Sequence, residues 1–186
     1  MKLRTLLILF VITLFTTSCT KKEGILEVSV DYQQKIKWAS DQFAVWIEDE
    51  AGNYINTLFV TKFATTELSI NERKTCVPVW VSKAQPLSMS AVELDGITMA
   101  TPDSGIITKV WDLKDRLGNK VKPGTYVFIL EATLDGDSRV IFKNSIKLGK
   151  KPVTVSGVPE FTHPSSEKHK DMIRSVVADY KLIEVE

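Results

Sequence analysis

The sequence is poor in the residues that build metal sites and disulfide scaffolds, with two cysteines and two histidines among 186 residues. Two cysteines exclude a disulfide-rich scaffold and a zinc site with four thiolates, and the spacing of His163 and His169 excludes an HExxH motif. Lys and Arg total 24 against 23 Asp and Glu, so the basic excess typical of nucleic-acid binders is absent. No serine-hydrolase elbow, P-loop or Rossmann glycine pattern occurs. Composition therefore predicts an ordinary globular domain that does not bind nucleic acid.

No apolar run reaches the roughly 20 residues of a membrane-spanning helix, but a shorter run lies at the N-terminus. Lys2 and Arg4 precede the apolar segment 6–15, and three small polar residues then lead to Cys19. This order is typical of a secretory signal. With the cysteine it resembles a bacterial lipoprotein signal, which implies cleavage after residue 18 and lipidation of Cys19. Thr16 stands where leucine is commonest, and the alternative is a plain secretory signal in which Cys19 has no role.

The chain is therefore expected to divide into a signal peptide over residues 1–18, a lipidated tether over 19–24 and one domain over 25–186. Removal of the signal takes away two cations and leaves 22 basic against 23 acidic residues. Contact with the membrane then depends on the lipid and not on net charge. Cys76, which lies in an apolar run, is expected to be a buried thiol.

Most of the mature chain has the alternating apolar and polar pattern of half-buried strands. The expected strands are Ile25–Tyr32, Phe43–Glu48, Tyr54–Phe63, Ile106–Leu113, Thr125–Leu134, Arg139–Leu148 and Met172–Val185. Turn signals lie at 49–53, 114–124 and 135–138, and Trp111 and Tyr126 are expected to pack at the ends of paired strands. The predicted fold is all-β, an immunoglobulin-like antiparallel β-sandwich.

Two segments break the strand pattern. Residues 65–99 are expected to form a partly helical insertion, with a short helix within Asn71–Ala84. Gly157–Lys170 holds two prolines among polar residues, which predicts a surface loop.

The segment from Trp111 to Tyr126 (WDLKDRLGNKVKPGTY) combines Asp, Gly-Asn and Pro-Gly, which form turns. It resembles the immunoglobulin-like domain of the flagellar hook-capping protein. With Phe43–Asp49, Thr57–Leu58 and the 95–101 segment, it resembles a family of predicted periplasmic domains of unknown function that share this sandwich. The resemblance covers about residues 25–186. It implies the fold and a setting near extracytoplasmic flavin and iron-uptake proteins, and it carries no established activity.

The segment 95–101 (DGITMAT) resembles the acceptor sequence for covalent flavin attachment outside the cytoplasm. The resemblance makes Thr101 the residue that takes FMN through a phosphoester. The matching recognition residues are Asp95, Thr98 and Ala100, on an exposed loop. Met99 departs from the pattern, which has glycine at that position. The alternative is a loop before the next strand, in which Asp95 caps a turn and Met99 packs into the core.

These features predict a lipid-anchored protein of the cell envelope that binds a partner and is not an enzyme. The family resemblance alone places it in an envelope redox or metal-uptake system. One alternative is a covalent FMN carrier for electron transfer, loaded by a flavin transferase. The other is a glycan- or protein-binding surface lipoprotein, for which Trp38 is the best exposed aromatic. The other three tryptophans, Trp46, Trp80 and Trp111, are expected in the core.

Overall fold

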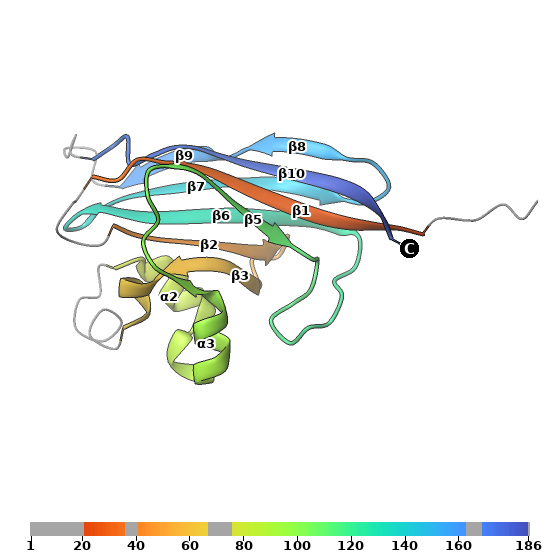
Figure 1. Cartoon of the computed structure of the whole chain (residues 1–186), viewed down its shortest axis with the longest axis horizontal. Coiled ribbons are helices and arrows are strands. Elements are labelled where there is room, and N and C mark those ends of the chain that lie inside the picture. The colour runs from red at the N-terminus through yellow and green to blue at the C-terminus, as the bar shows by residue number, and fades with distance from the viewer. Residues whose placement is uncertain (1–20, 36–40, 67–75, 163–168, 186) are drawn as a thin grey trace, which may run out of the picture.

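A computed structural model describes residues 21–35, 41–66, 76–162 and 169–185. Its strands are β1 (Lys21–Tyr32), β2 (Gln42–Asp49), β3 (Tyr54–Thr61), β4 (Thr98–Met99), β5 (Gly105–Trp111), β6 (Gly124–Asp135), β7 (Ser138–Leu148), β8 (Val153–Ser156), β9 (Val158–Thr162) and β10 (Ile173–Val185). They form a four-stranded sheet in the order β5-β1-β10-β8 and a six-stranded sheet in the order β4-β3-β2-β6-β7-β9. The two sheets pack face to face (Figure 1), which confirms the all-β sandwich.

The inter-sheet core is built by alternation along the strands. Leu26, Val28 and Val30 of β1 are fully buried and meet apolar side chains of β2 and β6. The neighbouring β1 side chains, among them Glu27 and Asp31, point to the solvent side of the four-stranded sheet and are only partly covered. The sequence pattern located this strand because one face of it meets water, but β1 begins at Lys21 and not at the expected Ile25.

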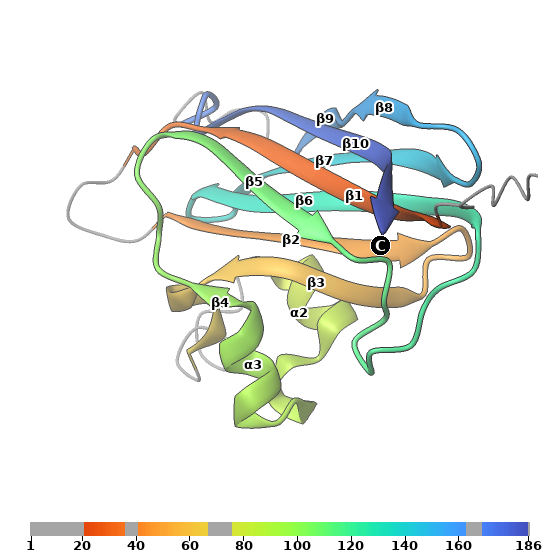
Figure 2. The same cartoon turned by 45° about the vertical axis from the view of Figure 1, so that its right-hand side comes forward.

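The six-stranded sheet is covered on its second face by short helices (Figures 1 and 2). They are η1 (Lys62–Thr65), α2 (Pro78–Ala84), η2 (Pro86–Ser88) and α3 (Ala91–Ile97). A second apolar cluster lies between these helices and the sheet and contains Trp46, Trp80 and Cys76, each at most 2% exposed. Strand β2 is therefore buried on both faces, which explains its unbroken apolar run.

Helix α2 begins against a buried carboxyl group of the sheet. Glu131 of β6 is 0% exposed and accepts hydrogen bonds from the backbone N–H of Trp80 at 2.9 Å and of Val79 at 3.3 Å. Arg139 of β7 approaches the same carboxylate at 3.5 Å. Burial raises the pKa of Glu131, and the hydrogen bonds and Arg139 oppose that rise. The Glu131 side chain thus satisfies helix N–H groups that have no partner within α2.

The connection over residues 114–124 differs from the expectation that Trp111 and Tyr126 lie on paired strands. β5 pairs with β1, where Trp111 lies opposite Leu26, whereas β6 pairs with β2 and β7. The turn therefore crosses from one sheet to the other, and the strands that it joins are not paired. Trp111 and Tyr126 still meet edge to face, with ring centroids 5.7 Å apart, because both line one end of the inter-sheet core.

The same turn chemistry serves this crossing and the β2–β3 hairpin. In Asp49–Asn53 and in Asp115–Asn119 the aspartate N–H donates to the asparagine carbonyl at 2.9 Å, and the glycine N–H donates to the aspartate carbonyl at 3.0 Å. Gly52 and Gly118 have φ of 82° and 85°, which glycine adopts without strain. Hydrogen bonds from the asparagines lower the pKa of both aspartates.

Two predictions about irregular segments were partly wrong. The surface loop expected over Gly157–Lys170 contains β9, an edge strand whose Pro159 suits an outer position because it needs no ladder N–H. The helical insertion is confirmed, but it holds α3 as well as α2, and α2 begins at Pro78. The rest of the expected helix, residues 71–75, and the loop residues 163–168 lie outside the described part of the chain.

Candidate functional site

The flavin-acceptor-like segment is mostly regular structure and not the expected exposed loop. Asp95 lies in the last turn of α3, a helix that begins at a capping box formed by Ser90 and Glu93. Thr98 pairs with Val60 in the short parallel ladder between β4 and β3, and its hydroxyl donates to the Leu94 carbonyl at 2.6 Å. The expectation of a loop is therefore wrong for residues 95–99.

The end of this segment does lie in a connection, where the chain crosses from β4 to β5. Met99 is partly buried against the inter-sheet core, as the structural alternative expected. Ala100 is exposed, and Thr101 is half-buried. The Thr101 hydroxyl makes one long contact, donating to the Asp41 carbonyl at 3.5 Å.

A polar cluster around the buried Asp41 lies beside this crossing. Asp41 is 2% exposed, and its Oδ2 accepts hydrogen bonds from the Tyr32 hydroxyl at 2.7 Å and the Lys35 N–H at 2.9 Å. Burial, with the hydrogen bond to Asp41, raises the pKa of Tyr32. The Ser104 hydroxyl accepts from the backbone N–H of Gln34 at 2.9 Å. The cluster therefore fixes the ends of β1 and β5 beside Thr101.

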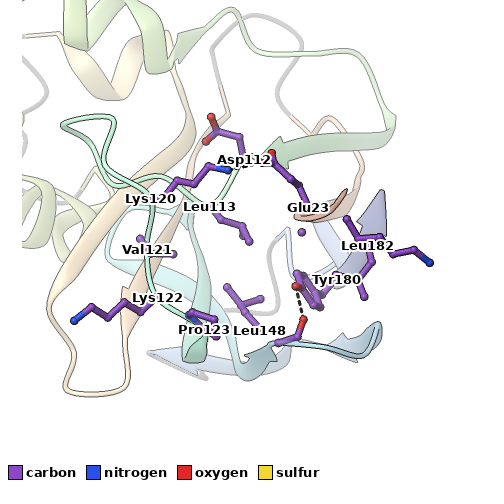
Figure 3. Close-up of a pocket in the computed structure, with 13 residues that line it drawn as sticks. Glu23, Asp112, Leu113, Lys120, Val121, Lys122, Pro123, Leu148, Tyr180 and Leu182 are labelled. Atoms are coloured by element: carbon purple, nitrogen blue, oxygen red, sulfur yellow. Dashed lines mark hydrogen bonds and ion pairs between the residues drawn. The ribbon is translucent and has the colours of Figure 1, made fainter. Parts of the chain in front are cut away.

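A pocket of about 290 Å³ opens at the opposite end of the sandwich, where β1 begins. Its walls come from four separate segments: the start of β1, the turn before β6, the end of β7 and the end of β10. Figure 3 shows Leu113, Leu148 and Tyr180 directed into this space, while the Lys122 side chain extends away from it. The floor is therefore mainly apolar.

The rim of the pocket carries charges of both signs. Lys120 donates to Glu23 at 2.8 Å, and Lys114 forms an ion pair with Asp112. The hydrogen bond to Asp112 raises the pKa of Lys114. An apolar floor within a charged rim is the arrangement that binds a ligand with an apolar part and a polar part.

Gly24 makes room for the aromatic wall of the pocket. A Cβ atom at this position would lie 2.4 Å from the Tyr180 hydroxyl oxygen and 2.6 Å from the ring. The ring is held in place, because it is 3% exposed and its hydroxyl donates to the Gly149 carbonyl at 2.8 Å. The absence of a side chain at Gly24 thus sets the position of Tyr180.

Gly24→Ala is expected to destabilise the protein by about 1–3 kcal/mol, because Tyr180 must leave its place or the strands must separate. Urea unfolding followed by tryptophan fluorescence measures the change. Gly96→Ala is the matched control: its Cβ would meet nothing within 4 Å, and in a helix it should stabilise by about 0.5–1 kcal/mol. Equal stabilities of Gly24→Ala and wild type would contradict the close packing.

Two other hollows lie outside this pocket. One of about 450 Å³ lies between the end of α2 and the 114–124 turn and is lined by Tyr54, Lys83 and Arg116 among others. Another of about 390 Å³ follows the β7–β8 turn, beside Lys147, Lys150 and Lys151. Within the described ranges, no three His, Cys, Asp or Glu side chains are grouped to hold a metal ion.

The structure does not bring the sequence-predicted residues and the pocket together. Thr101 lies at one end of the sandwich and the pocket at the other, while Cys19 and Trp38 lie outside the described residues. The sequence offered no single signal for the pocket, because its walls are far apart along the chain. None of the helices in the described segments is long and apolar enough to cross a membrane.

Comparisons with known proteins identify one family. No curated protein and no solved structure matches the chain. A family model described as "Predicted periplasmic protein (DUF2271)" matches residues 25–162, about three-quarters of the chain. The match covers the strands from β1 to β9 and supports a location in the cell envelope, on its periplasmic side. The chain belongs to this family of predicted periplasmic proteins of unknown function.

Proposed function

We propose that this chain is a lipid-anchored envelope protein that works by binding, through the pocket at the start of β1, and has no catalytic activity of its own. The observation that carries the proposal is the position of that pocket. Lys22 and Gly24 line it, and β1 begins at Lys21, two positions after Cys19. A lipid on Cys19 would hold the pocket beside the membrane.

The pocket chemistry favours an amphipathic ligand or the amphipathic segment of a partner protein. Leu148 and Tyr180 supply apolar contact, while the Lys120–Glu23 ion pair supplies polar groups at the rim. An accessory role in an envelope redox or metal-uptake system rests on the family resemblance.

Replacement of Cys19 tests the anchor. In cells fed an alkyne-tagged fatty acid, the wild-type protein should carry the tag and sediment with membranes, and Cys19→Ser should lose both properties. Cys76→Ser is the control, because Cys76 is the other cysteine and is buried in the second apolar cluster. This substitution should leave the tag unchanged. An untagged wild-type protein would end the proposal of a lipid anchor.

A paired substitution tests the pocket. Val121→Arg places a long charged side chain in the pocket, whereas Leu117→Arg places the same group on the same turn at a residue that is 72% exposed and does not line the pocket. Native mass spectrometry of protein extracted from its own envelope should show a bound ligand or partner in wild type and Leu117→Arg, and none in Val121→Arg. Identical spectra for all three proteins would reject the pocket as the binding site.

A second candidate function is a covalent FMN carrier with Thr101 as the acceptor. It is favoured by one observation: Thr101 follows an exposed alanine, and its hydroxyl makes a single contact of 3.5 Å among the described residues. Protein matured together with a flavin transferase should then gain the mass of FMN, and Thr101→Val should not. Met99→Gly, which restores the glycine of the acceptor pattern, should increase the modified fraction. An unmodified wild-type mass would end this candidate.

A further inference from the structure

Three lysines follow one another around the β7–β8 turn and form an exposed basic patch. Lys147, Lys150 and Lys151 are all exposed, and none of them pairs with an acidic side chain in the described part of the chain. They surround a hollow of about 390 Å³ that Pro152 and Val153 also line. These three residues are called the lysine patch below.

The lysine patch lies at the end of the sandwich where β1 begins. Leu148 pairs with Gly124 at the start of β6, and Val153 pairs with Tyr180 near the end of β10. Lys22 pairs with Glu184 in the neighbouring ladder. Figure 1 shows the β7–β8 connection, the first residues of β1 and the end of β10 together at the right-hand end of the molecule.

Acidic side chains of β1 and β10 at this end pair with other lysines. Glu23 accepts from Lys120 at 2.8 Å, and Glu184 lies 3.8 Å from Lys22. The lysine patch is therefore not neutralised by its surroundings, although the mature chain as a whole is close to neutral. Its positive charge is local and directed outward.

The short segment between Cys19 and β1 limits how far this end of the sandwich can lie from a lipid attached to Cys19. Only Thr20 separates Cys19 from the first residue of β1, and two residues extend at most about 7 Å. If Cys19 carries the lipid anchor proposed above, this end of the sandwich cannot move far from the bilayer surface.

We infer that the lysine patch docks onto the anionic headgroups of the membrane that holds the lipid anchor, so that the strands point end-on at the bilayer. This inference rests on the proposed lipid anchor for its location, but the patch itself is testable without the lipid. Lysines near an anionic surface each strengthen binding by about five-fold, so loss of three should weaken binding by about 100-fold. Salt should weaken it as well.

Vesicle binding of the unlipidated mature chain tests the patch. The Cys19→Ser protein should co-sediment with phosphatidylcholine vesicles that contain phosphatidylglycerol, and much less with phosphatidylcholine alone. Replacing Lys147, Lys150 and Lys151 with glutamine should reduce this binding by about 100-fold. The matched control replaces Lys62, Lys109 and Lys143, which lie on other parts of the domain, and removes the same charge.

Comparison of the two triple variants shows whether vesicle binding depends on the position of the three lysines or only on the net charge of the protein. Equal losses in both, or no loss in the patch variant, would overturn the inference. Because this assay uses no lipid anchor, its failure is distinct from a failure of fatty-acid tagging on Cys19. Thermal unfolding of the patch variant should match wild type, since all three replaced side chains are exposed.

Orientation on the membrane gives a second readout. A fluorophore on Lys150→Cys in the lipidated protein should be quenched by lipids that carry a nitroxide at the headgroup. The same fluorophore on Lys62→Cys, in η1, should be quenched much less. Equal quenching at the two positions, or the reverse order, would overturn the end-on arrangement.

Discussion

Glu131→Ala is expected to destabilise the protein by about 3–5 kcal/mol, because removing one partner leaves buried charge and N–H groups without compensation. The Glu131 carboxylate accepts hydrogen bonds from the backbone N–H groups of Val79 and Trp80, and it lies 3.5 Å from the Arg139 guanidinium. Its loss would leave the start of α2 and one side of the guanidinium unpaired. Equilibrium unfolding in urea measures the change.

A matched variant on the same sheet separates burial from charge. Glu160 of β9 also pairs with a basic residue, Lys143, but its side chain is 61% exposed, whereas that of Glu131 is 0% exposed. Glu160→Ala should therefore change stability by less than about 1 kcal/mol. A similar loss in both variants would contradict the role of burial.

The pH dependence of stability gives an independent signature of Glu131. Burial raises the pKa of this carboxyl in the folded state above its usual value of 4.5. Between the two pKa values the folded state binds more protons than the unfolded state, so this group lowers the free energy of unfolding as pH rises from about 4.5 through the raised pKa. Glu131→Gln should lack this component. A wild-type-minus-variant difference that does not change over this pH range would refute the assignment.

Trp80→Ala is expected to cost about 3–5 kcal/mol, the usual loss for a fully buried tryptophan. The ring is 0% exposed between α2 and the six-stranded sheet, and its Nε1 donates to the Thr57 hydroxyl at 2.9 Å. No other side chain of α2 has comparable buried volume. The substitution should therefore loosen the helices from the sheet and expose Trp46 beneath them.

Two measurements make this prediction specific. Trp80→Phe keeps an aromatic ring but loses the hydrogen bond, so it should destabilise less than Trp80→Ala. Hydrogen exchange in Trp80→Ala should increase in α2 and α3 and much less in β1 and β10, which lie in the other sheet. A uniform increase across both sheets would mean that the helical layer and the sandwich unfold as one unit.

Local signals in the sequence located most of the strands. β1, β2, β3, β5, β6, β7 and β10 were all predicted from apolar alternation and turn residues. β4, β8 and β9 were missed because they are short edge strands with few buried side chains. Helix α3 was also missed, although Ser90 and Glu93 have the spacing of a capping box, a local signal that could have predicted it.

Some candidate sites were found from the sequence, and others are formed only by the tertiary structure. The export signal, Cys19 and the acceptor-like segment ending at Thr101 were found from short motifs, and the functional roles assigned to them stay predictions. The pocket was not found, because Gly24, Val121 and Tyr180 meet only when the ends of β1, β6, β7 and β10 are brought to one end of the sandwich. The lysine patch is visible as a local sequence cluster, but its closeness to the start of β1 is not.

The sequence by itself determined where most of the strands lie and where the chain turns, since these depend on residues that are neighbours along the chain. The tertiary structure alone decided that β5 pairs with β1 and not with β6, although residues 114–124 use the same turn chemistry as a hairpin. It also decided that helices cover β2 on its second face. Both outcomes depend on which apolar faces meet across space, and a turn motif or a single strand carries no record of its distant partner.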